Sequence, residues 1–263
     1  MRTQKIPIAL AIAGSDSGGG AGVQADLKTF AALGVHGTSA ITCLTAQNPA
    51  RVSRIEPCSP LIIRRQIETA FAKLPPAAIK TGMLFSAEII RAVASCLKQR
   101  PNALLVIDPV MISTSGRRLL KPDAMKVLQQ KLFPLASLIT PNLDEASVLL
   151  GAPLRSLDDM RKAARELHRR FGCATLIKGG HLPNATRATD ILFDGKKELR
   201  LTSPFIPGLR LHGTGCTYSA AITAHLALGA SLPQAVMRAK RYITHAILHR
   251  QTAGEHTVLN HFH

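Results

Sequence analysis

Aromatic residues are scarce in this chain of 263 residues. Tryptophan is absent, and Phe, Trp and Tyr together make up 4% of the sequence, whereas apolar residues reach 46%. Proteins that bind single-stranded nucleic acids stack the bases on aromatic side chains. The scarcity therefore argues against that mode of binding, and it predicts a core made mainly of aliphatic side chains.

The cysteines form neither pairs nor close clusters. Their number is odd and no two have the Cys-x-x-Cys spacing of a zinc or redox site, since they stand at positions 43, 58, 96, 173 and 216. Neither a disulfide framework nor a zinc site is indicated. We expect a protein of the reducing cytoplasm.

Long hydrophobic runs are also missing, because none approaches the ~20 residues that a membrane-spanning helix needs. Arg2 and Lys5 precede an apolar stretch at residues 6–13, as in a short signal peptide, but this stretch ends in Gly14-Ser15-Asp16. A buried first strand followed by a turn is the better interpretation. We expect no association with a membrane.

Acidic residues are few relative to basic ones. The chain has 33 Lys and Arg against 16 Asp and Glu, a formal net charge of +17, which favours anionic small molecules and is also compatible with nucleic acid. The basic clusters are dispersed over different predicted elements, at residues 64–65, 117–118, 169–170, 196–197 and 238–241. A solvated basic surface is the better interpretation, and we expect no specific binding of nucleic acid.

Strand and helix patterns alternate along the chain. No Pro- or Ser-rich linker interrupts it, so we treat residues 1–263 as one domain. Short apolar runs typical of buried strands occur at residues 6–13, 38–44, 78–80, 104–107, 138–140 and 174–177. Helical patterns occur at residues 24–33, 61–74, 86–99, 123–132, 143–150, 157–171, 217–228 and 232–249. This order predicts a mostly parallel sheet covered by helices on both faces.

Residues with strong cap or turn preferences mark several boundaries. Typical helix starts are Ser59-Pro60 and Ser156, and typical stops are Gly34, Gly151 and Gly172. Residues 191–193 and 199–201, on either side of Asp194-Gly195, predict a late hairpin at the edge of the sheet.

A glycine-rich turn, His212-Gly213-Thr214-Gly215-Cys216, opens directly into one of the predicted helices. Unpaired N–H groups and the helix dipole favour an anion at such a helix start, and glycine lets a phosphate approach the backbone. The alternative is a plain turn with Cys216 as a small core residue.

The first predicted strand ends in a second glycine-rich segment, residues 14–22, which has five glycines in nine residues. It lacks the Gly-Lys-Ser/Thr of a Walker A loop, and its spacing misses Gly-x-Gly-x-x-Gly. After the second strand, the amides of Gln47 and Asn48 are either loop polar groups or partners for the edge of a heterocycle.

Two carboxylates, Asp108 and Glu145, follow predicted strands and are therefore expected at one edge of the sheet. There they could hold Mg²⁺ through water molecules. Asn142 and Glu145 also fit a capping box, which is the purely structural alternative. Because Lys178 adds a cation after the sixth strand, the set suggests a phosphoryl-transfer site.

These motifs are similar to those of a known family. Residues 13–29 resemble the opening of the hydroxymethylpyrimidine/phosphomethylpyrimidine kinases of thiamine biosynthesis, which have a ribokinase-like fold. The similarity continues in order through residues 46–48, 80–83, 108–111, 140–146, 178–181 and 212–217. The resemblance implies an α/β fold: a three-layer α/β/α sandwich around a mostly parallel central sheet.

The resemblance also implies roles for individual residues at the substrate end of the site. Asp26 and Gln47 would hold the alcohol and amine edge of the pyrimidine, and Gly14 and Met83 would line its pocket. Gly213, Gly215 and Cys216 would form the catalytic anion hole, with Cys216 facing the substrate oxygen.

At the nucleotide end, the resemblance implies that Asn142, Lys178 and Thr214 bind ATP and that Asp108 and Glu145 serve Mg²⁺. Two segments depart from the family pattern. Residues 208–211 replace a polar stretch before the anion hole, and residues 253–256 replace a Gly-x-Gly-Pro-like segment near the C-terminus.

The function expected from the resemblance is ATP-dependent phosphorylation of 4-amino-5-hydroxymethyl-2-methylpyrimidine and then of its monophosphate, by a homodimer. A pyridoxal kinase of the same fold is the alternative enzyme, and a basic nucleic-acid-binding protein or a catalytically silent regulator is the alternative class. Cys216 carries a further hypothesis: the helix start lowers its pKa below ~8.5, so that it accepts the hydroxymethyl proton.

Overall fold

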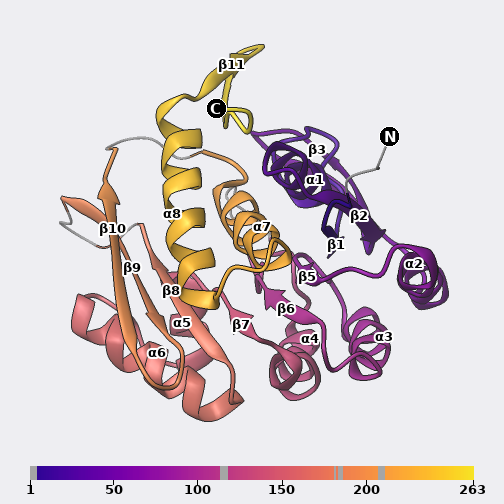
Figure 1. The fold of residues 1–263 in the computed structure, drawn as a ribbon, viewed down its shortest axis with the longest axis horizontal. Helices are drawn as coiled ribbons and strands as arrows, with labels where there is room; N and C mark the ends of the chain where they lie inside the picture. Colours follow the sequence, from indigo (N-terminus) through magenta and orange to yellow (C-terminus); the bar gives the residue numbers. More distant parts are fainter. Residues whose placement is uncertain (1–4, 113–117, 181, 183–185, 207–210) are drawn as a thin grey trace.

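A computed structural model describes residues 5–112, 118–180, 182, 186–206 and 211–263. Its described residues form three layers, with helices on both sides of a central sheet (Figure 1). The sheet has the strand order β10-β9-β8-β7-β6-β5-β1-β2. In chain order these strands are β1 Ile8–Ala13, β2 His36–Ile41, β5 Ala78–Thr81, β6 Leu104–Ile107, β7 Leu138–Ile139, β8 Ala174–Gly179, β9 Arg187–Phe193 and β10 Glu198–Pro204.

Within this sheet, the neighbouring strands β2, β1, β5, β6, β7 and β8 pair in parallel, whereas β9 and β10 pair antiparallel at one edge. This arrangement confirms the prediction of a mostly parallel sheet that ends in a late hairpin. Parallel strands place their carboxyl ends at the same edge, so the loops after β1, β5, β6, β7 and β8 converge there.

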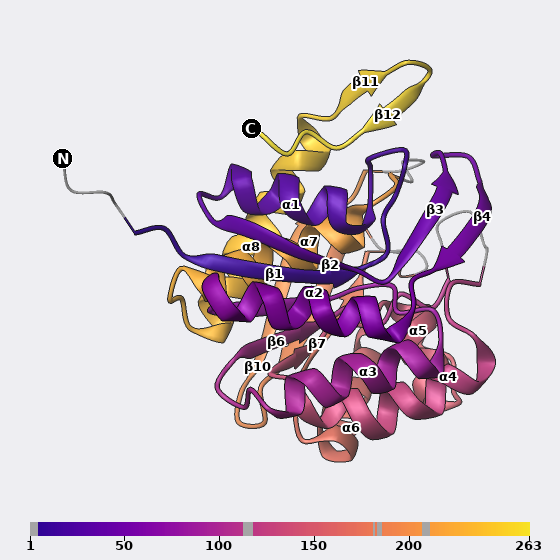
Figure 2. The ribbon, with the colours of Figure 1, turned by 90° about the vertical axis from the view of Figure 1, so that its right-hand side faces the viewer.

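Alternating side chains of the buried strands feed two separate cores. In β1, Leu10 and Ile12 join the core on one face, while Ala9 and Ala11 join the core on the other. The first core is covered by α2 Pro60–Lys73, α3 Ala87–Lys98, α4 Pro122–Val127, α5 Leu143–Leu150 and α6 Leu157–Phe171. The second is covered by α1 Gly22–Ala32, α7 Thr214–Ala227 and α8 Leu232–Leu248, and Figure 2 shows α1 and α2 on opposite sides of β1 and β2.

The caps predicted from the sequence set the bounds of two helices. α5 begins after Asn142, whose side chain accepts a hydrogen bond from the N–H of Glu145, and it ends at Gly151 with φ +73°. α6 begins after Ser156 and ends at Gly172, also with φ +73°. Because glycine adopts the left-handed conformation readily, these caps terminate both helices where the sequence predicts.

The predicted strand at residues 38–44 is confirmed as far as Ile41, the end of β2, but its continuation is wrong because the chain leaves the sheet there. The N–H of Thr42 donates to the carbonyl of Ala13, and its hydroxyl donates to the carbonyl of Met83 at 2.6 Å. The next residues form β3 Cys43–Gln47, which pairs antiparallel with β4 Val52–Pro57 in a separate two-stranded sheet. The predicted helix at 123–132 likewise changes, since α4 continues as a π-helical turn, η1 Leu128–Leu132, and a 3₁₀ turn, η2 Phe133–Leu135.

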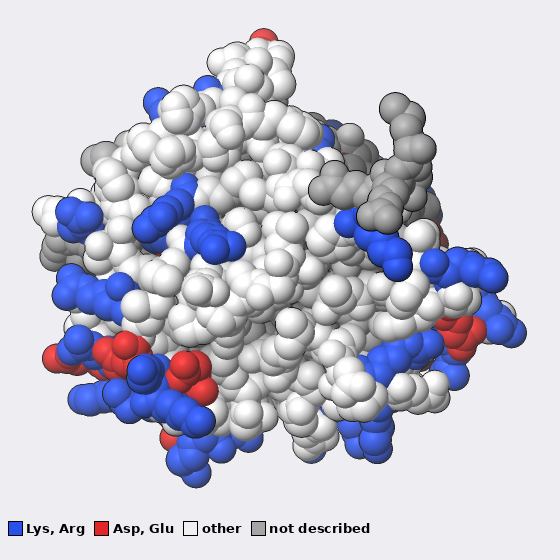
Figure 3. All heavy atoms as spheres, in the orientation of Figure 1, with Lys and Arg blue, Asp and Glu red and all other residues white. Residues whose placement is uncertain are grey.

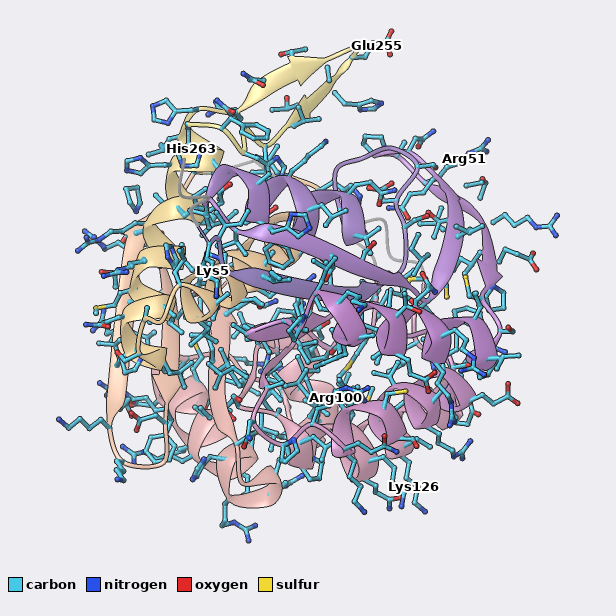
Figure 4. All side chains as sticks on the ribbon, turned by 45° about the vertical axis from the view of Figure 1, so that its right-hand side comes forward. Lys5, Arg51, Arg100, Lys126, Glu255 and His263 are labelled. Carbon is cyan, nitrogen blue, oxygen red and sulfur yellow. The ribbon has the colours of Figure 1, made fainter. Side chains whose placement is uncertain are left out.

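The C-terminal departure from the family pattern forms a small exposed hairpin, β11 Gln251–Ala253 and β12 His256–Val258, with Glu255 at its tip (Figure 4). Of the other departure, at residues 208–211, only Leu211 is described; residues 208–210 lie outside the described residues, as does His181. On the face shown in Figure 3, Lys and Arg form separate groups with uncharged surface between them. Among the helices of the described residues, none is long and apolar enough to cross a membrane.

Candidate active site

A cavity of about 560 Å³ opens at the carboxyl ends of the parallel strands. Every site residue predicted from the sequence except Asp26 lines it: Gly14, Gln47, Met83, Asp108, Asn142, Glu145, Lys178, Gly213, Thr214, Gly215 and Cys216. These residues come from segments that are far apart in the chain, from Gly14 to Cys216. The fold therefore gathers the predicted set in one place.

The first turn of α7 forms one wall of the cavity. The helix begins at Thr214, three residues before the predicted start, and Gly213 at its N-cap has φ +83°. A side chain at Gly213 would make its Cβ clash with the carbonyl oxygen of Gly20. Only glycine allows this close approach. The first hydrogen bond of the helix runs from the N–H of Thr217 to the carbonyl of Gly213. The N–H groups of Thr214, Gly215 and Cys216 precede it and therefore have no partner within the helix.

Lys178 and Asp108 form an ion pair beside that turn. Nζ of Lys178 lies 2.9 Å from Oδ1 of Asp108, and the hydroxyl of Ser219 donates to Oδ2 at 3.2 Å. Burial by itself would raise the pKa of Asp108, but the charges of Lys178 and Lys80 hold it below its ordinary value. Asp108 is therefore a carboxylate at neutral pH, although it is almost completely buried.

The Glu145 carboxylate has the capping role that the sequence indicates, and it also faces the cavity. It accepts hydrogen bonds from the N–H groups of Asn142 and Met111, at 3.0 and 3.1 Å, and so completes the capping box of α5. The same side chain lines the cavity. Burial raises the pKa of Glu145, and the negative charge of Asp108 raises it further while Lys178 opposes both effects. A cation near both carboxylates would relieve this repulsion.

Asp26 lies below the cavity wall and is fully buried. Its Oδ1 is 2.6 Å from Nζ of Lys80, which is also fully buried and lines the cavity. Its Oδ2 has no hydrogen-bond partner among the described residues. Burial raises the pKa of Asp26 to about 6 in spite of the lysine, so the pair remains ionised at pH 7. Direct contact between Asp26 and a substrate stays a prediction.

The role of Lys80 is not evident from the sequence, where it belongs to an apolar strand. The sequence gives two signals, the place of Lys80 in the family match at residues 80–83 and its charge, because a lysine is almost never fully buried without a partner. The partner lies 54 positions earlier in the chain, and neither strand nor helix periodicity indicates this pairing.

A second unpredicted cluster links Asp16, His212 and Gln47. Nε2 of His212 lies 2.9 Å from Oδ2 of Asp16 and 3.0 Å from the side-chain amide nitrogen of Gln47. Gln47 ends β3 at an irregularity in the pairing with β4, a feature that redirects a side chain. Asp16 and His212 stand in the two glycine-rich motifs, but their contact spans 196 positions.

Cys216 contradicts the hypothesis of a lowered pKa. Its side chain is half-buried on the cavity wall, and burial raises the pKa of the thiol to about 11, although Lys80 partly opposes this effect. The loss of solvation outweighs the positive end of the helix dipole. With its pKa raised in this way the thiol is mainly protonated at neutral pH, which argues against its serving as the acceptor of the hydroxymethyl proton.

The cavity extends from these residues toward α8. Its lining there includes Tyr218, Lys240 and Asp190. Lys240 and Asp190 form a buried ion pair, with Nζ 2.7 Å from Oδ2. Asp190 Oδ1 also accepts from the N–H of Gly179 at 3.0 Å. Apolar side chains such as Ile243 and Ile247 also line this extension.

Comparison with known proteins gives a consistent result. The profile of the family described as Phosphomethylpyrimidine kinase matches residues 16–260. The chain is 49% identical over 253 residues to the thiamine biosynthesis bifunctional protein ThiED of Geobacter sulfurreducens, covering 96% of this chain and 51% of that protein. It is 44% identical to the hydroxymethylpyrimidine/phosphomethylpyrimidine kinase of Bacillus subtilis, covering 97% of this chain and 94% of the other.

A solved structure supports the same assignment. The ADP complex of Bacillus subtilis pyridoxal kinase matches with a TM-score of 0.90 and 40% identity, covering 98% of each chain. The fold is therefore that of the ribokinase-like kinases, as the sequence predicts. The chain belongs to the phosphomethylpyrimidine kinase family. It spans about half the length of the bifunctional relative and nearly all of the single kinase.

Proposed function

We propose that this protein transfers phosphoryl groups from ATP to 4-amino-5-hydroxymethyl-2-methylpyrimidine and then to the resulting monophosphate, as a step of thiamine biosynthesis. The observation that carries the proposal is the shared cavity: the open first turn of α7, the Lys178–Asp108 pair and the Gln47 amide all face it. An anion site, a cation and a group that reads a heterocycle are what transfer to a heterocyclic alcohol requires.

The nucleotide phosphates would lie between the start of α7 and Lys178, with Thr214 and Asn142 at their sides. Backbone N–H groups at the helix start and the lysine charge would stabilise the charge that develops on the transferred group. The structural homologue with bound ADP supports the use of an adenine nucleotide.

The residues present also fit a magnesium ion. Asp108 and Glu145 both line the cavity, and the charge of one raises the pKa of the other. Their oxygens already accept protein hydrogen bonds, which favours contact through water, as Mg²⁺ often has. Such an ion would neutralise charge on the nucleotide phosphates when bound.

The acceptor would lie at the opposite end of the cavity, against Gly14, Met83 and Gln47. A side chain on Gly14 would place Cβ 3.1 Å from Cε of Met83, so glycine there keeps room for a flat ring. The amide of Gln47 can donate and accept at once, which matches an aminopyrimidine edge. Cys216, as a neutral thiol, would contribute shape and a weak hydrogen bond to the substrate oxygen.

Pyridoxal phosphorylation is the second candidate, because the solved pyridoxal kinase has nearly the same fold. An assay that couples ADP release to a colour change separates the two. We expect a higher kcat/KM for the pyrimidine alcohol and its monophosphate than for pyridoxal. Preference for pyridoxal would reverse the order of the candidates.

A homodimer and a single folded domain are further proposals. Sedimentation velocity tests the homodimer, and a single unfolding transition tests the single domain.

A further inference from the structure

The imidazole of His212 is held between a carboxylate and the amide that the proposed function assigns to the substrate. The side chain is largely buried, and Nε2 is in contact with both Asp16 and Gln47. A side chain at Gly20 would bring Cβ within 3.0 Å of Cδ2 of His212, so the ring packs directly against this glycine. The ring is therefore fixed by its neighbours on two sides.

Asp16 determines where the imidazole carries its proton. Besides His212, the carboxylate accepts hydrogen bonds from the N–H groups of Gly18, Gly20 and Ala21, at 2.8, 3.1 and 2.8 Å. These donors and His212 hold the pKa of Asp16 below its ordinary value in spite of burial. An ionised carboxylate 2.9 Å from Nε2 requires N–H there, because a nitrogen lone pair would be repelled.

This protonation has a consequence for Gln47. Two N–H donors do not bond to each other, so the amide nitrogen found 3.0 Å from Nε2 has no acceptor there. A half turn about the last side-chain bond exchanges the amide nitrogen and oxygen. The hydrogen-bond pattern therefore favours Oε1 next to His212 and directs the NH₂ group away from it.

Ser17 holds the main chain of Gln47. The hydroxyl of Ser17 accepts from the N–H of Gln47 at 2.8 Å and donates to its carbonyl at 2.7 Å. Both main-chain polar groups of Gln47 are thus engaged by one side chain. With the main chain held in this way, the contact with His212 decides the order of donor and acceptor at the end of the Gln47 side chain.

We propose that His212 is a positioning residue that fixes the order of donor and acceptor presented by the Gln47 amide, and so selects a 4-aminopyrimidine over its 4-oxo counterpart. The inference rests on the proposed function, because it takes Gln47 as the contact to the ring. An aminopyrimidine offers a donor at the C4 substituent and an acceptor at the adjacent ring nitrogen. The 4-oxo ring offers the reverse order and would need the amide turned around.

The hydroxymethyl group prevents the 4-oxo ring from matching the amide by binding in a turned-over orientation. It is attached next to C4 and has to face the transferred phosphoryl group, so turning the ring over would move the reacting oxygen away. The wrong ring would leave buried polar groups unpaired, a defect that sites of this kind reject strongly.

The test compares kcat/KM for 4-amino-5-hydroxymethyl-2-methylpyrimidine and for the 4-oxo analogue in the full-length protein. We expect the wild type to prefer the amino compound by at least about 100-fold, the discrimination reached by sites that hydrogen-bond their substrate. His212→Leu removes the donor and should reduce this ratio at least about tenfold. His212→Gln restores an N–H donor and should bring the ratio back.

The matched control is His245→Leu, the same substitution at an exposed position of α8, which should leave the ratio unchanged. An unchanged ratio in His212→Leu, with the aminopyrimidine still phosphorylated, would overturn the role of His212 and leave the proposed function standing. A wild type that does not phosphorylate the aminopyrimidine would overturn the proposed function and this inference together.

A second measurement reports on the folded wild type and uses His212→Gln only to assign the signals. The ¹⁵N and ¹³C chemical shifts of histidine side chains distinguish the two neutral tautomers, and the His212 signals are assigned by their disappearance in His212→Gln. We expect the Nε2–H form near neutral pH. A proton on Nδ1 alone would contradict the proposal, because Nε2 would then accept from the Gln47 amide instead of donating to it.

Discussion

Nζ of Lys178 lies 2.9 Å from Oδ1 of Asp108, and a side chain at Gly215 would place Cβ 3.3 Å from the same Nζ. The ion pair therefore lies directly against the backbone of the first turn of α7. A phosphate bound at that turn would meet the lysine charge without any rearrangement of the helix. A larger residue at this position would crowd Nζ of Lys178, so the glycine leaves the lysine close to the helix start.

Lys178→Met tests this arrangement. Loss of the cation should lower kcat at least about 100-fold, the scale observed when a charge-stabilising group is removed. The variant leaves Asp108 buried without its main partner, so we also expect a loss of ~3 kcal/mol in the free energy of unfolding. Turnover should be measured at a temperature where denaturant titration shows the variant folded. Turnover within twofold of the wild type would remove Lys178 from the reaction.

Asp108→Asn separates the metal role from the fold. The amide retains the shape of the carboxylate but binds a cation less well, so activity should fall at least about tenfold and rise again with added Mg²⁺. The control is Asp123→Asn, an exposed position in the first turn of α4. The measurement is the Mg²⁺ dependence of kcat/KM. An unchanged dependence would argue against contact between Asp108 and the ion.

The raised pKa of Cys216 predicts a slow reaction with alkylating agents. With a pKa of about 11 in place of 9.0, the thiolate fraction near pH 8 is about 100-fold smaller than for an unperturbed thiol. The rate should rise about tenfold for each pH unit and level off near pH 11, as far as the fold persists. Peptide mass spectrometry follows Cys216, and the urea-unfolded chain is the reference. Faster labelling of Cys216 in the folded protein than in the unfolded chain at pH 7 would contradict the raised pKa.

The same protonation state changes what Cys216→Ala should do. A neutral thiol is not the base for the alcohol, so both phosphorylation steps should lose activity to a similar and modest extent, less than about tenfold. A selective loss in the first step would restore the role of proton acceptor.

Gln47→Met tests how the ring is recognised. Met has a similar length but no group that pairs with an aminopyrimidine edge, so kcat/KM for the pyrimidine should fall at least about 100-fold. The value for pyridoxal should fall much less, because its ring lacks that edge. Parallel measurement of both alcohols gives the comparison. Equal losses would mean that Gln47 does not contact the ring.

The features of the fold that could be predicted are those set by residues close together in the sequence. Helices α5 and α6 have the predicted bounds because Asn142, Gly151, Ser156 and Gly172 are local signals. β4 was missed because its exposed residues, including Arg54 and Glu56, give no apolar strand pattern.

The same limit, that contacts between distant residues cannot be predicted from local sequence, holds in the site. Motif similarity predicted the residues that line the cavity, but not the ion pair of Lys80 with Asp26 or the contact of His212 with Asp16. These contacts join residues 54 and 196 positions apart, and their partners become evident only when the strands are assembled. The sign of the Cys216 pKa shift also depends on burial, which the local sequence does not determine.

We propose that one cavity phosphorylates the same pyrimidine twice. ³¹P nuclear magnetic resonance of the purified protein with ATP, Mg²⁺ and 4-amino-5-hydroxymethyl-2-methylpyrimidine follows both transfers directly. We expect the monophosphate ester signal to appear first and then to give way to the two coupled signals of the diphosphate. No phosphorylated pyrimidine, under conditions in which pyridoxal is converted to its phosphate, would contradict the claim.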